Sequence, residues 1–445
     1  MENNSTKRLL ILIGIVIFFV ILVIVWYFFY AKPIIAPELG RPNNPLPVRT
    51  FPPRFQFLNN WRSNTVSTST TEITDPLTKP LIQVWNKPAT GQTFIVDQIL
   101  KEVLATTTVL RATTTTSTST AKGTSTVITI KKTERATSTV LIFVDRVTGY
   151  IYGYLVETGN VYQISNTVLP GITDAYFFDN GKRVIMRYAD YEKNTVTGLI
   201  ANVPTVPQNG SALPLENIQY LTGEVTSVAI NAKKDKVSYS VGTSNGSTIY
   251  TLNPKGPSVV ASSPFKEWIL SYGGDSLFVT SKPSAYVEGS TLSLPLFESE
   301  VVEKTGLMTL PSPTGSLLNS MWGSKGLVTF FVSPSGTKVL PIATLVSKCV
   351  WGLNNFLACA VPRTLTKTTE GLPDDWYQGR VAFNDDLVIV DTSSNEKYQL
   401  YTFSEEDGIF DVAKITISKD NDLLSFNKHQ DATLWLLNTN NIPGE

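Results

Sequence analysis

Residues Lys348 to Pro362 read KCVWGLNNFLACAVP, and this stretch sets the pattern from which the fold is predicted. Two apolar runs, CVW and FLACAV, flank a short segment of Gly and Asn centred on Asn354. Apolar runs rich in β-branched and aromatic residues, separated by a few turn-forming residues, are typical of β-hairpins. The stretch therefore predicts two antiparallel strands joined by a tight turn.

A turn centred on Asn354 places Cys349 and Cys359 directly opposite each other. Opposed residues in an antiparallel pair have β-carbons close enough for a disulfide. We therefore predict a Cys349–Cys359 disulfide in an oxidising compartment, and two buried free thiols are the alternative. These are the chain's 2 cysteines, and with 1 histidine they cannot fill a structural zinc site, so no metal is expected.

The hairpin pattern recurs along the chain. A strand, a tight polar turn and an apolar strand are read in AYFFDNGKRVIMRY, VAINAKKDKVSYSV, ILSYGGDSLFVT, SMWGSKGLVTFF and ITISKDNDLLSF. The turns of the six hairpins fall near Gly181, Asp235, Gly274, Ser324, Asn354 and Asn421. Several hairpins are followed by two further strands, as a four-stranded propeller blade requires. A β-sandwich would not repeat this unit so often.

With the unit around LIFVDRVTGYIYGYLVETGNVYQIS, the count predicts an all-β propeller of about seven blades. The last unit, Asp411 to Asn438, stops at its third strand. A segment near Leu81 is expected to supply the missing strand and close the ring. Asp97 to Ala105 is the one fair helix candidate. Thr106 to Thr126 is a Thr/Ser-rich insertion, interpreted as mobile, with a protruding β-hairpin as the alternative.

The N-terminus predicts a membrane anchor. Leu9 to Tyr30 is an unbroken apolar run preceded by Lys7 and Arg8. A bilayer-spanning helix needs about 20 such residues, and basic residues favour the cytoplasmic side. A cleaved signal peptide would have a shorter apolar region and a small-residue cleavage site.

The predicted organisation follows from this anchor. Residues 1–8 form a cytoplasmic stub, 9–30 a transmembrane helix, 31–65 a linker rich in Pro and then in Thr and Ser, and 66–445 an extracytoplasmic propeller. The bilayer is thus one expected partner, through Leu9 to Tyr30. The 37 basic and 37 acidic residues cancel, which argues against binding to nucleic acid.

One long loop, Pro362 to Arg380, is the candidate binding site. It links two strands of one blade and carries Asp374, Asp375, Trp376, Tyr377 and Arg380. Trp, Tyr and Arg dominate binding hot spots, and long loops are often functional. The alternative is that Trp376 and Tyr377 fold back and plug one end of the ring.

Catalytic patterns are weak, and no catalytic residue or cofactor is predicted. Ser244 lies in a G-x-S-x-G pattern between two strands, where a nucleophile elbow would need a helix, and His429 is interpreted as a solvated loop residue. Asp420-Asn421-Asp422 lacks the later ligands of a calcium loop. Carboxylates that could serve a glycosidase are Asp374, Asp375, Asp385, Asp386, Glu405, Glu406 and Asp407.

The repeat resembles WD-repeat and related non-WD propellers, and membrane-anchored propeller proteins of small-genome bacteria. The segments that carry the resemblance are RVTGYIYGYLVETGNVYQISNT, RVIMRY, the KCVW/ACAVP hairpin and LPDDWYQGRVAF. The Trp-Asp and Gly-His signatures of true WD repeats are missing. The resemblance implies the fold and the anchor, and no activity.

These observations favour a non-catalytic binding or scaffolding module in the cell envelope that contacts an envelope protein or a surface glycan. Two other functions stay open. An envelope hydrolase would bring several carboxylates together at one mouth of the channel, and a purely structural component would show a broad apolar or self-complementary patch.

Overall fold

The computed structural model describes residues 79–110, 125–205, 210–323, 326–365 and 371–442. Of residues 98–110, 125–136 and 302, the backbone alone is described. The predicted stub, transmembrane helix and linker lie outside these ranges. Among the residues described, no helix is both long and apolar enough to cross a bilayer.

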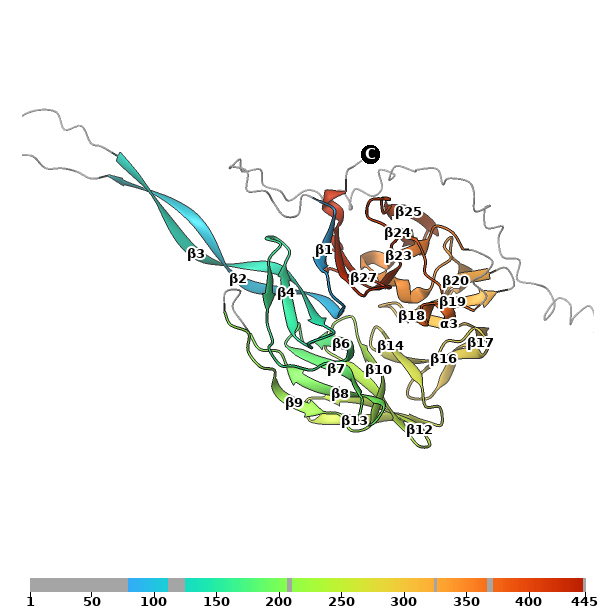
Figure 1. Ribbon diagram of the computed structural model, residues 1–445. Coiled ribbons are helices and arrows are strands. Elements are labelled where there is room, and N and C mark those ends of the chain that lie inside the picture. Colours follow the sequence, from blue (N-terminus) through green and yellow to red (C-terminus); the bar gives the residue numbers. More distant parts are fainter. Residues whose placement is uncertain (1–78, 111–124, 206–209, 324–325, 366–370, 443–445) are drawn as a thin grey trace, which may run out of the picture. The chain divides into compact units, whose positions relative to one another are not determined.

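The described chain folds into seven four-stranded antiparallel sheets, which follow one another in chain order (Figure 1). The first three sheets comprise β2 Ala89–Leu110, β3 Ser125–Asp145, β4 Ile151–Leu155 and β5 Val161–Gln163; β6 Ile172–Phe178, β7 Arg183–Asp190, β8 Thr195–Asn202 and β9 Glu216–Tyr220; and β10 Glu224–Ile230, β11 Val237–Thr243, β12 Gly246–Asn253 and β13 Gly256–Ser263.

The remaining sheets complete the set. They comprise β14 Trp268–Gly273, β15 Ser276–Ser281, β16 Glu288–Ser293 and β17 Glu298–Thr305; β18 Met308–Pro311, β19 Leu317–Gly323, β20 Gly326–Ser333 and β21 Gly336–Val339; β22 Cys349–Trp351, β23 Phe356–Pro362, β24 Asp385–Asp391 and β25 Glu396–Tyr401; and β26 Val412–Ile417, β27 Leu423–Lys428 and β28 Leu434–Asn438 with β1 Leu81–Trp85. The short helices are η3 Val346–Lys348, η4 Leu353–Asn355, α3 Asp374–Tyr377 and η5 Thr439–Asn441.

The first strands of the sheets pack against one another in sequence and close a ring. Strand β2 contacts β6, β6 contacts β10, β10 contacts β14 and β14 contacts β18. Strand β18 contacts η3, which leads into β22; β22 contacts β26, and β26 returns to β2. Successive packing of four-stranded sheets around one axis defines a seven-bladed β-propeller, as the repeat predicted.

The last blade is completed from the other end of the described chain. Strand β1 pairs with β28 in an antiparallel register, with Leu81 opposite Leu437. Leu81 packs into the same core cluster as Phe426 and Leu437. The predicted role of the segment near Leu81 is confirmed. This pairing removes an unpaired strand edge that would otherwise be open to other chains.

The cysteine hairpin forms as predicted. Strands β22 and β23 place Cys349 opposite Cys359 around the turn η4. Asn354 and Asn355 adopt positive φ values of 57° and 64°, a conformation that Asn tolerates better than most residues. The two sulfur atoms form a disulfide.

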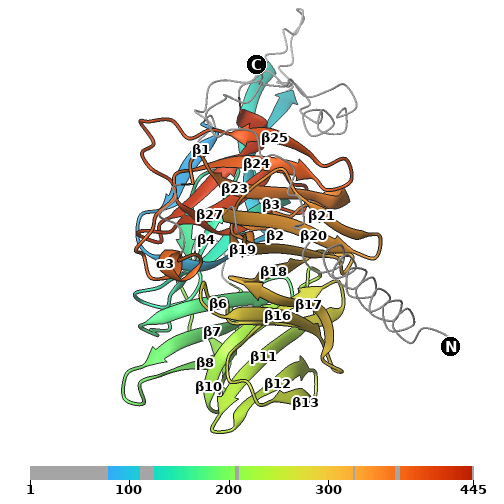
Figure 2. The same cartoon turned by 90° about the vertical axis from the view of Figure 1, so that its right-hand side faces the viewer.

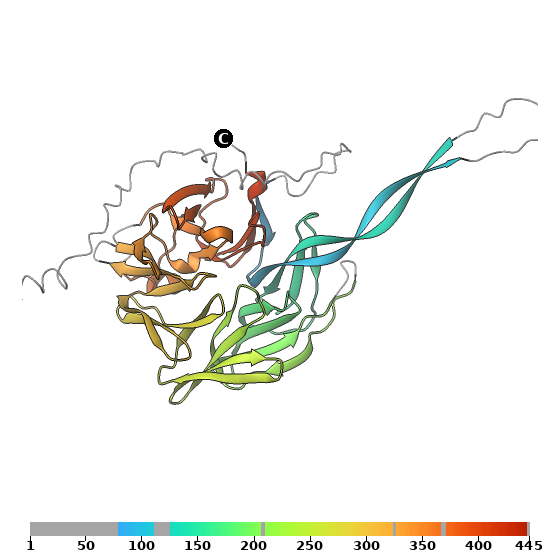
Figure 3. The ribbon, with the colours of Figure 1, turned by 180° about the vertical axis from the view of Figure 1, so that it is seen from behind.

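The first blade contains the largest departure from expectation. The helix predicted over Asp97 to Ala105 is wrong, because these residues lie in β2 and pair with Ser138 to Ile130 of β3. Ser125 to Thr139 of β3 pair with β2 alone, and here the two strands form a two-stranded ribbon (Figures 1 and 3). Residues 106–110 and 125–126 of the Thr/Ser segment lie in these strands, as the hairpin interpretation expected; residues 111–124 lie outside the described ranges.

One hairpin was assigned to the wrong pair of strands. The runs on either side of Ser324, a residue outside the described ranges, form β19 and β20, the second and third strands of the fifth blade. The first strand is β18, which is only four residues long and follows a glycine turn. Such a short strand carries too little pattern to be recognised beside its longer neighbours.

Candidate binding face

The connection between β23 and β24 contains helix α3 and all five residues predicted for the binding site. Strand direction alternates within a blade, so the second-to-third connections and the connections leading to the next blade emerge at the same end of the strands. We call this end of the propeller the α3 face. Figure 2 shows α3 outside the sheets, at their edge.

Helix α3 is fixed to the fourth and fifth blades. The Asp374 carboxylate accepts a hydrogen bond of 2.5 Å from the Ala285 amide in the β15–β16 connection. Gly306, between β17 and β18, lies beneath the loop with φ of +66°, and a β-carbon there would stand 3.1 Å from the Leu372 carbonyl oxygen. A glycine thus permits the close approach of the α3 loop.

Trp376 fixes the loop to the seventh blade. Its side chain is buried, and its indole Nε1 donates to Asp411 Oδ1 and Oδ2 at 3.0 and 2.9 Å. The ring stacks on His429 with centroids 4.2 Å apart and an interplanar angle of 16°. His429 Nε2 also lies 3.0 Å from the Trp376 carbonyl oxygen. His429 is therefore half-buried and packed, and the prediction of a solvated residue is wrong.

Beneath Trp376 lies a fully buried charge cluster. Lys348, Asp385 and Asp411 each have 0% exposed side-chain area. Lys348 Nζ lies 2.7 Å from Asp385 Oδ2 and 2.6 Å from Asp411 Oδ1. The ammonium also lies 4.4 Å from the centroid of the Phe383 ring. Charges in such a dry site need close partners, because their hydration has been removed.

The two carboxylates of the cluster differ in their surroundings. Asp411 accepts from Lys348, from Trp376 and from the Phe383 amide at 3.1 Å. Asp385 Oδ2 accepts from Lys348 and from the Val412 amide at 2.8 Å, whereas its buried Oδ1 has no hydrogen-bond partner among the described residues. Burial raises the pKa of Asp385 to about 6, although the positive charge of Lys348 opposes the shift.

Sequence reasoning included Asp385 among the candidate carboxylates but missed Lys348 and Asp411. The available signal was a lysine placed directly before an apolar strand, in LVSKCVW. A lysine that is buried beside an apolar strand needs a nearby anion, but the sequence does not indicate which carboxylate would supply it.

The other predicted site residues in and beside α3 differ in how much of their surface is exposed to solvent. Tyr377 keeps 49% of its surface exposed, and Arg380 is exposed and pairs with Asp375 at 3.0 Å. Trp376 faces the interior, as the alternative interpretation held for that side chain. The surface available to a partner is therefore Tyr377, Arg380 and their neighbours, while Trp376 holds them in place.

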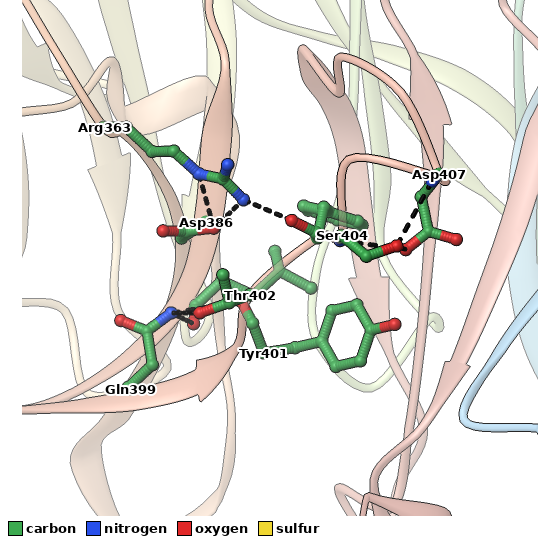
Figure 4. Close-up of polar contacts among 9 residues, drawn as sticks. Arg363, Asp386, Gln399, Tyr401, Thr402, Ser404 and Asp407 are labelled. Carbon is green, nitrogen blue, oxygen red and sulfur yellow. Dashed lines mark hydrogen bonds and ion pairs between the residues drawn. The ribbon is translucent and has the colours of Figure 1, made fainter. Parts of the chain in front are cut away.

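The remaining candidate carboxylates are engaged separately. Asp386 accepts from Arg363 Nε and Nη2 at 3.0 and 2.8 Å (Figure 4). Arg363 Nη2 also donates to the Phe403 carbonyl oxygen at 2.5 Å. Asp407 accepts from the Ser404 hydroxyl at 2.7 Å, within the β25–β26 connection. These contacts shape the connection, and Glu405 and Glu406 are exposed beside it.

More of the exposed large apolar side chains lie in connections at the α3 face than at the opposite end. Among the residues described, nine of the exposed large hydrophobic residues lie in second-to-third or blade-to-blade connections: Val147, Val168, Tyr191, Phe265, Tyr286, Val287, Leu365, Tyr377 and Ile409. Connections at the opposite end carry three: Leu213, Leu296 and Leu353. Exposed apolar residues that rim one face of a protein are candidates for an interaction surface.

The remaining sequence patterns are turns. Ser244 and Asn245 form the two-residue turn between β11 and β12, where Thr243 pairs with Gly246. Asp420 and Asn421 lie in the turn between β26 and β27, closed by a hydrogen bond of 2.6 Å from the Ser418 hydroxyl to Asp422. Within the described ranges, no group of three or more His, Cys, Asp or Glu side chains is arranged to hold a metal ion.

No protein-family model matches the chain, and neither does any curated protein. Solved structures with a similar fold include an oligogalacturonate lyase from Vibrio parahaemolyticus (TM-score 0.43, 8% identity, covering 68% of this chain and 86% of that one). The β-propeller domain of the Trilobed protease from Pyrococcus furiosus has a TM-score of 0.43 and 9% identity, covering 68% of this chain and 91% of that one. Kuenenia stuttgartiensis hydrazine synthase has a TM-score of 0.41 and 11% identity, covering 58% and 74%. These similarities concern the fold alone.

The fold and the site define the class: a seven-bladed β-propeller whose last blade is closed by β1, with a helical loop fixed across one face.

Proposed function

We propose that this protein is a membrane-anchored, extracytoplasmic propeller that binds a protein partner through the α3 face and catalyses no reaction. The excess of exposed apolar side chains in the connections of that face over those of the opposite end carries the proposal. Five of them, Val147, Val168, Val287, Leu365 and Ile409, are aliphatic. Aliphatic side chains neither stack on sugar rings as aromatic ones do nor offer hydrogen bonds, so a polypeptide suits this face better than a glycan.

The loop architecture supports a binding role. Asp374 fixes α3 to the fourth blade and Trp376 fixes it to the seventh, so Tyr377 and Arg380 are presented from a rigid support. A preorganised loop loses less conformational entropy on binding than a free one. Tyr and Arg on such a support are the residue types that dominate binding energy.

The state of the charged groups supports a non-catalytic role. Lys348, Asp385 and Asp411 are closed off from solvent, and Asp386 and Asp375 are held in ion pairs. A hydrolase needs an acid and a second carboxylate that both face the substrate.

The placement outside the cytoplasm rests on Leu9 to Tyr30 with its preceding basic residues, and on the disulfide. Disulfides form and persist in oxidising compartments. Protease treatment of intact cells tests this placement. We expect the propeller to be digested or shed while the N-terminal residues stay protected; full protection of the propeller until lysis would contradict it.

Site-specific photocrosslinking tests the binding face. A photoreactive phenylalanine analogue replaces Tyr286 or Tyr377 in the full-length chain, in the source organism. We expect both positions to yield the same discrete crosslinked product. Matched controls carry the analogue at Leu296 or Leu353, which are exposed at the opposite end of the strands.

The proposal is tested by comparing the crosslinked products formed from the α3 face with those formed from the opposite end of the strands. A product formed from both faces alike, or from neither, would contradict the proposal. Crosslinks confined to the α3 face that contain glycan would show that the partner class is wrong. Hydrolytic turnover of an envelope polymer, lost on replacing Asp374 or Asp375 with Ala, would favour the hydrolase instead.

A further inference from the structure

The buried cluster beneath Trp376 places an amine in direct contact with a carboxylate. Lys348 Nζ lies 2.7 Å from Asp385 Oδ2. The Asp385 Cγ atom is bonded to that oxygen at about 1.2 Å, so it lies within about 4 Å of Nζ. Reacting atoms held at about 3–3.5 Å in a fixed orientation gain greatly in rate over the same groups free in solution.

The two carboxylates are suited to different roles in such a reaction. Asp385 is deprived of hydrogen bonds at Oδ1, and burial favours its neutral, electrophilic form. Asp411 accepts from the Trp376 indole, from the Phe383 amide and from Lys348. Its Oδ1 lies 2.6 Å from Lys348 Nζ, so Asp411 is in place to accept a proton from the amine.

We propose that Lys348 and Asp385 become joined by an intramolecular amide bond after folding, with Asp411 accepting the proton that Lys348 must lose. The cluster would then be an autocatalytic cross-linking site. This proposal is independent of the binding function proposed above.

The atoms balance without any added reagent. The Lys348 ammonium gives one proton to Asp411, and the free amine attacks Cγ of the protonated Asp385. The Nζ–Cγ bond forms, and the bond from Cγ to one carboxyl oxygen breaks. That oxygen leaves as water, having taken up one further proton from the amine nitrogen. The amide keeps one hydrogen on Nζ, and Asp411 ends protonated.

The cluster is closed off from solvent, and the proposed product carries no charge. Phe383 and Trp376 cover the ammonium, with ring centroids 4.4 and 5.3 Å from Nζ. An apolar site penalises the ammonium and carboxylate pair, and condensation removes both charges. The bond would tie the residue before β22 to the first residue of β24, beside the Cys349–Cys359 bridge. The sixth blade would then contain a second covalent cross-link, and reducing agents would not cleave it.

Mass spectrometry of the full-length chain, purified in detergent and then reduced and denatured, tests the proposal. We expect a protein lighter than its sequence by one water molecule. Proteolysis should release a branched peptide that contains both Lys348 and Asp385, with trypsin unable to cut after Lys348. Recovery of these residues on separate linear peptides from the folded wild-type protein would overturn the proposal.

Variants and an internal control sharpen the test. Lys348→Arg keeps the positive charge but cannot form the amide, so it should show the full mass and migrate more slowly on a reducing denaturing gel. Asp411→Asn should retain a large unlinked fraction if it folds. The Lys414–Asp174 pair, 2.6 Å apart but partly exposed, should stay unlinked in every sample. A branched peptide at that pair as well would point to condensation during sample handling and overturn the assignment of a built site.

Discussion

The indole ring of Trp376 lies parallel to the imidazole ring of His429, with centroids 4.2 Å apart. Trp376 belongs to the sixth blade and His429 follows β27 of the seventh, so this contact joins two blades across their boundary. The same indole donates to Asp411, which immediately precedes β26. The α3 loop is therefore part of the packing between blades as well as part of a surface.

Trp376→Phe should lower the free energy of unfolding by about 1–3 kcal/mol, because the buried Asp411 loses a donor. Trp351→Phe is the matched control, since the buried indole Nε1 of Trp351 has no partner among the described residues and its removal should be nearly neutral. Urea unfolding of both variants measures the difference. Equal losses would contradict a specific role for the Trp376 hydrogen bond.

Leu81→Asp should open the closing blade. Leu81 is buried opposite Leu437, and a charge there would be placed in the core between β1 and β28. We expect a loss of several kcal/mol, on the order of 3–5, and aggregation through the exposed edge of β28. Gln83→Asp, at an exposed position of the same strand, should change stability by less than about 1 kcal/mol. Thermal unfolding with light scattering distinguishes the two variants, and similar behaviour of both would count against closure by β1.

Lys414→Met should weaken the ring where the last blade meets the first two. Lys414 Nζ lies 2.6 Å from Asp174 of β6 and 2.9 Å from the Thr90 hydroxyl of β2. Burial alone would raise the pKa of Asp174, but the charges of Lys414 and Arg187 outweigh it and lower that pKa. Because the pair is partly exposed, we expect a loss of about 0.5–1 kcal/mol at neutral pH.

The pH dependence of that loss has a defined sign. A lowered carboxylate pKa stabilises the fold above the pKa of the unfolded chain, about 4, and this stabilisation is lost as pH falls through the folded-state value. The difference between wild type and Lys414→Met should therefore shrink below about pH 4. Urea unfolding from pH 7 to pH 3 measures it. Lys282→Met, which removes a more exposed pair with Glu267, is the control and should have no measurable effect; a difference that grows on acidification would contradict the assignment.

Reduction of the Cys349–Cys359 disulfide should cost about 2–4 kcal/mol, chiefly by freeing the unfolded chain. Cys349→Ala with Cys359→Ala should show the same loss without reductant and no further loss with it. Unfolding with and without dithiothreitol measures both. An unchanged midpoint for the wild type on complete reduction would contradict a stabilising disulfide.

Much of the fold could be predicted from local patterns. The runs around Asn354, Gly181 and Asn421 are largely apolar and are bounded by turn residues, so the hairpins and the opposition of Cys349 and Cys359 follow from short-range rules. The missing fourth strand of the last blade was also visible, because three strands leave an edge unpaired. The helix predicted at Asp97 failed because pairing with β3 overrides a weak local preference.

The sequence identified the loop that carries the candidate site, but it did not identify which side chains of that loop are buried. The length of the loop and its Trp, Tyr and Arg content identified residues 362–380, but no local rule distinguishes the buried Trp376 from the half-exposed Tyr377 beside it. That distinction depends on Asp411 and His429, which come from another blade.

The sequence by itself determined most of the strands, their turns, the repeat and the cysteine pair, because each depends on residues close together along the chain. Only the tertiary structure decided that Lys348, Asp385 and Asp411 meet in one dry site, since they lie far apart in sequence and are brought together by the packing of the sixth blade against the seventh. It also decided which end of the propeller collects exposed apolar side chains. Both outcomes follow from long-range packing, whose partners a local pattern does not specify.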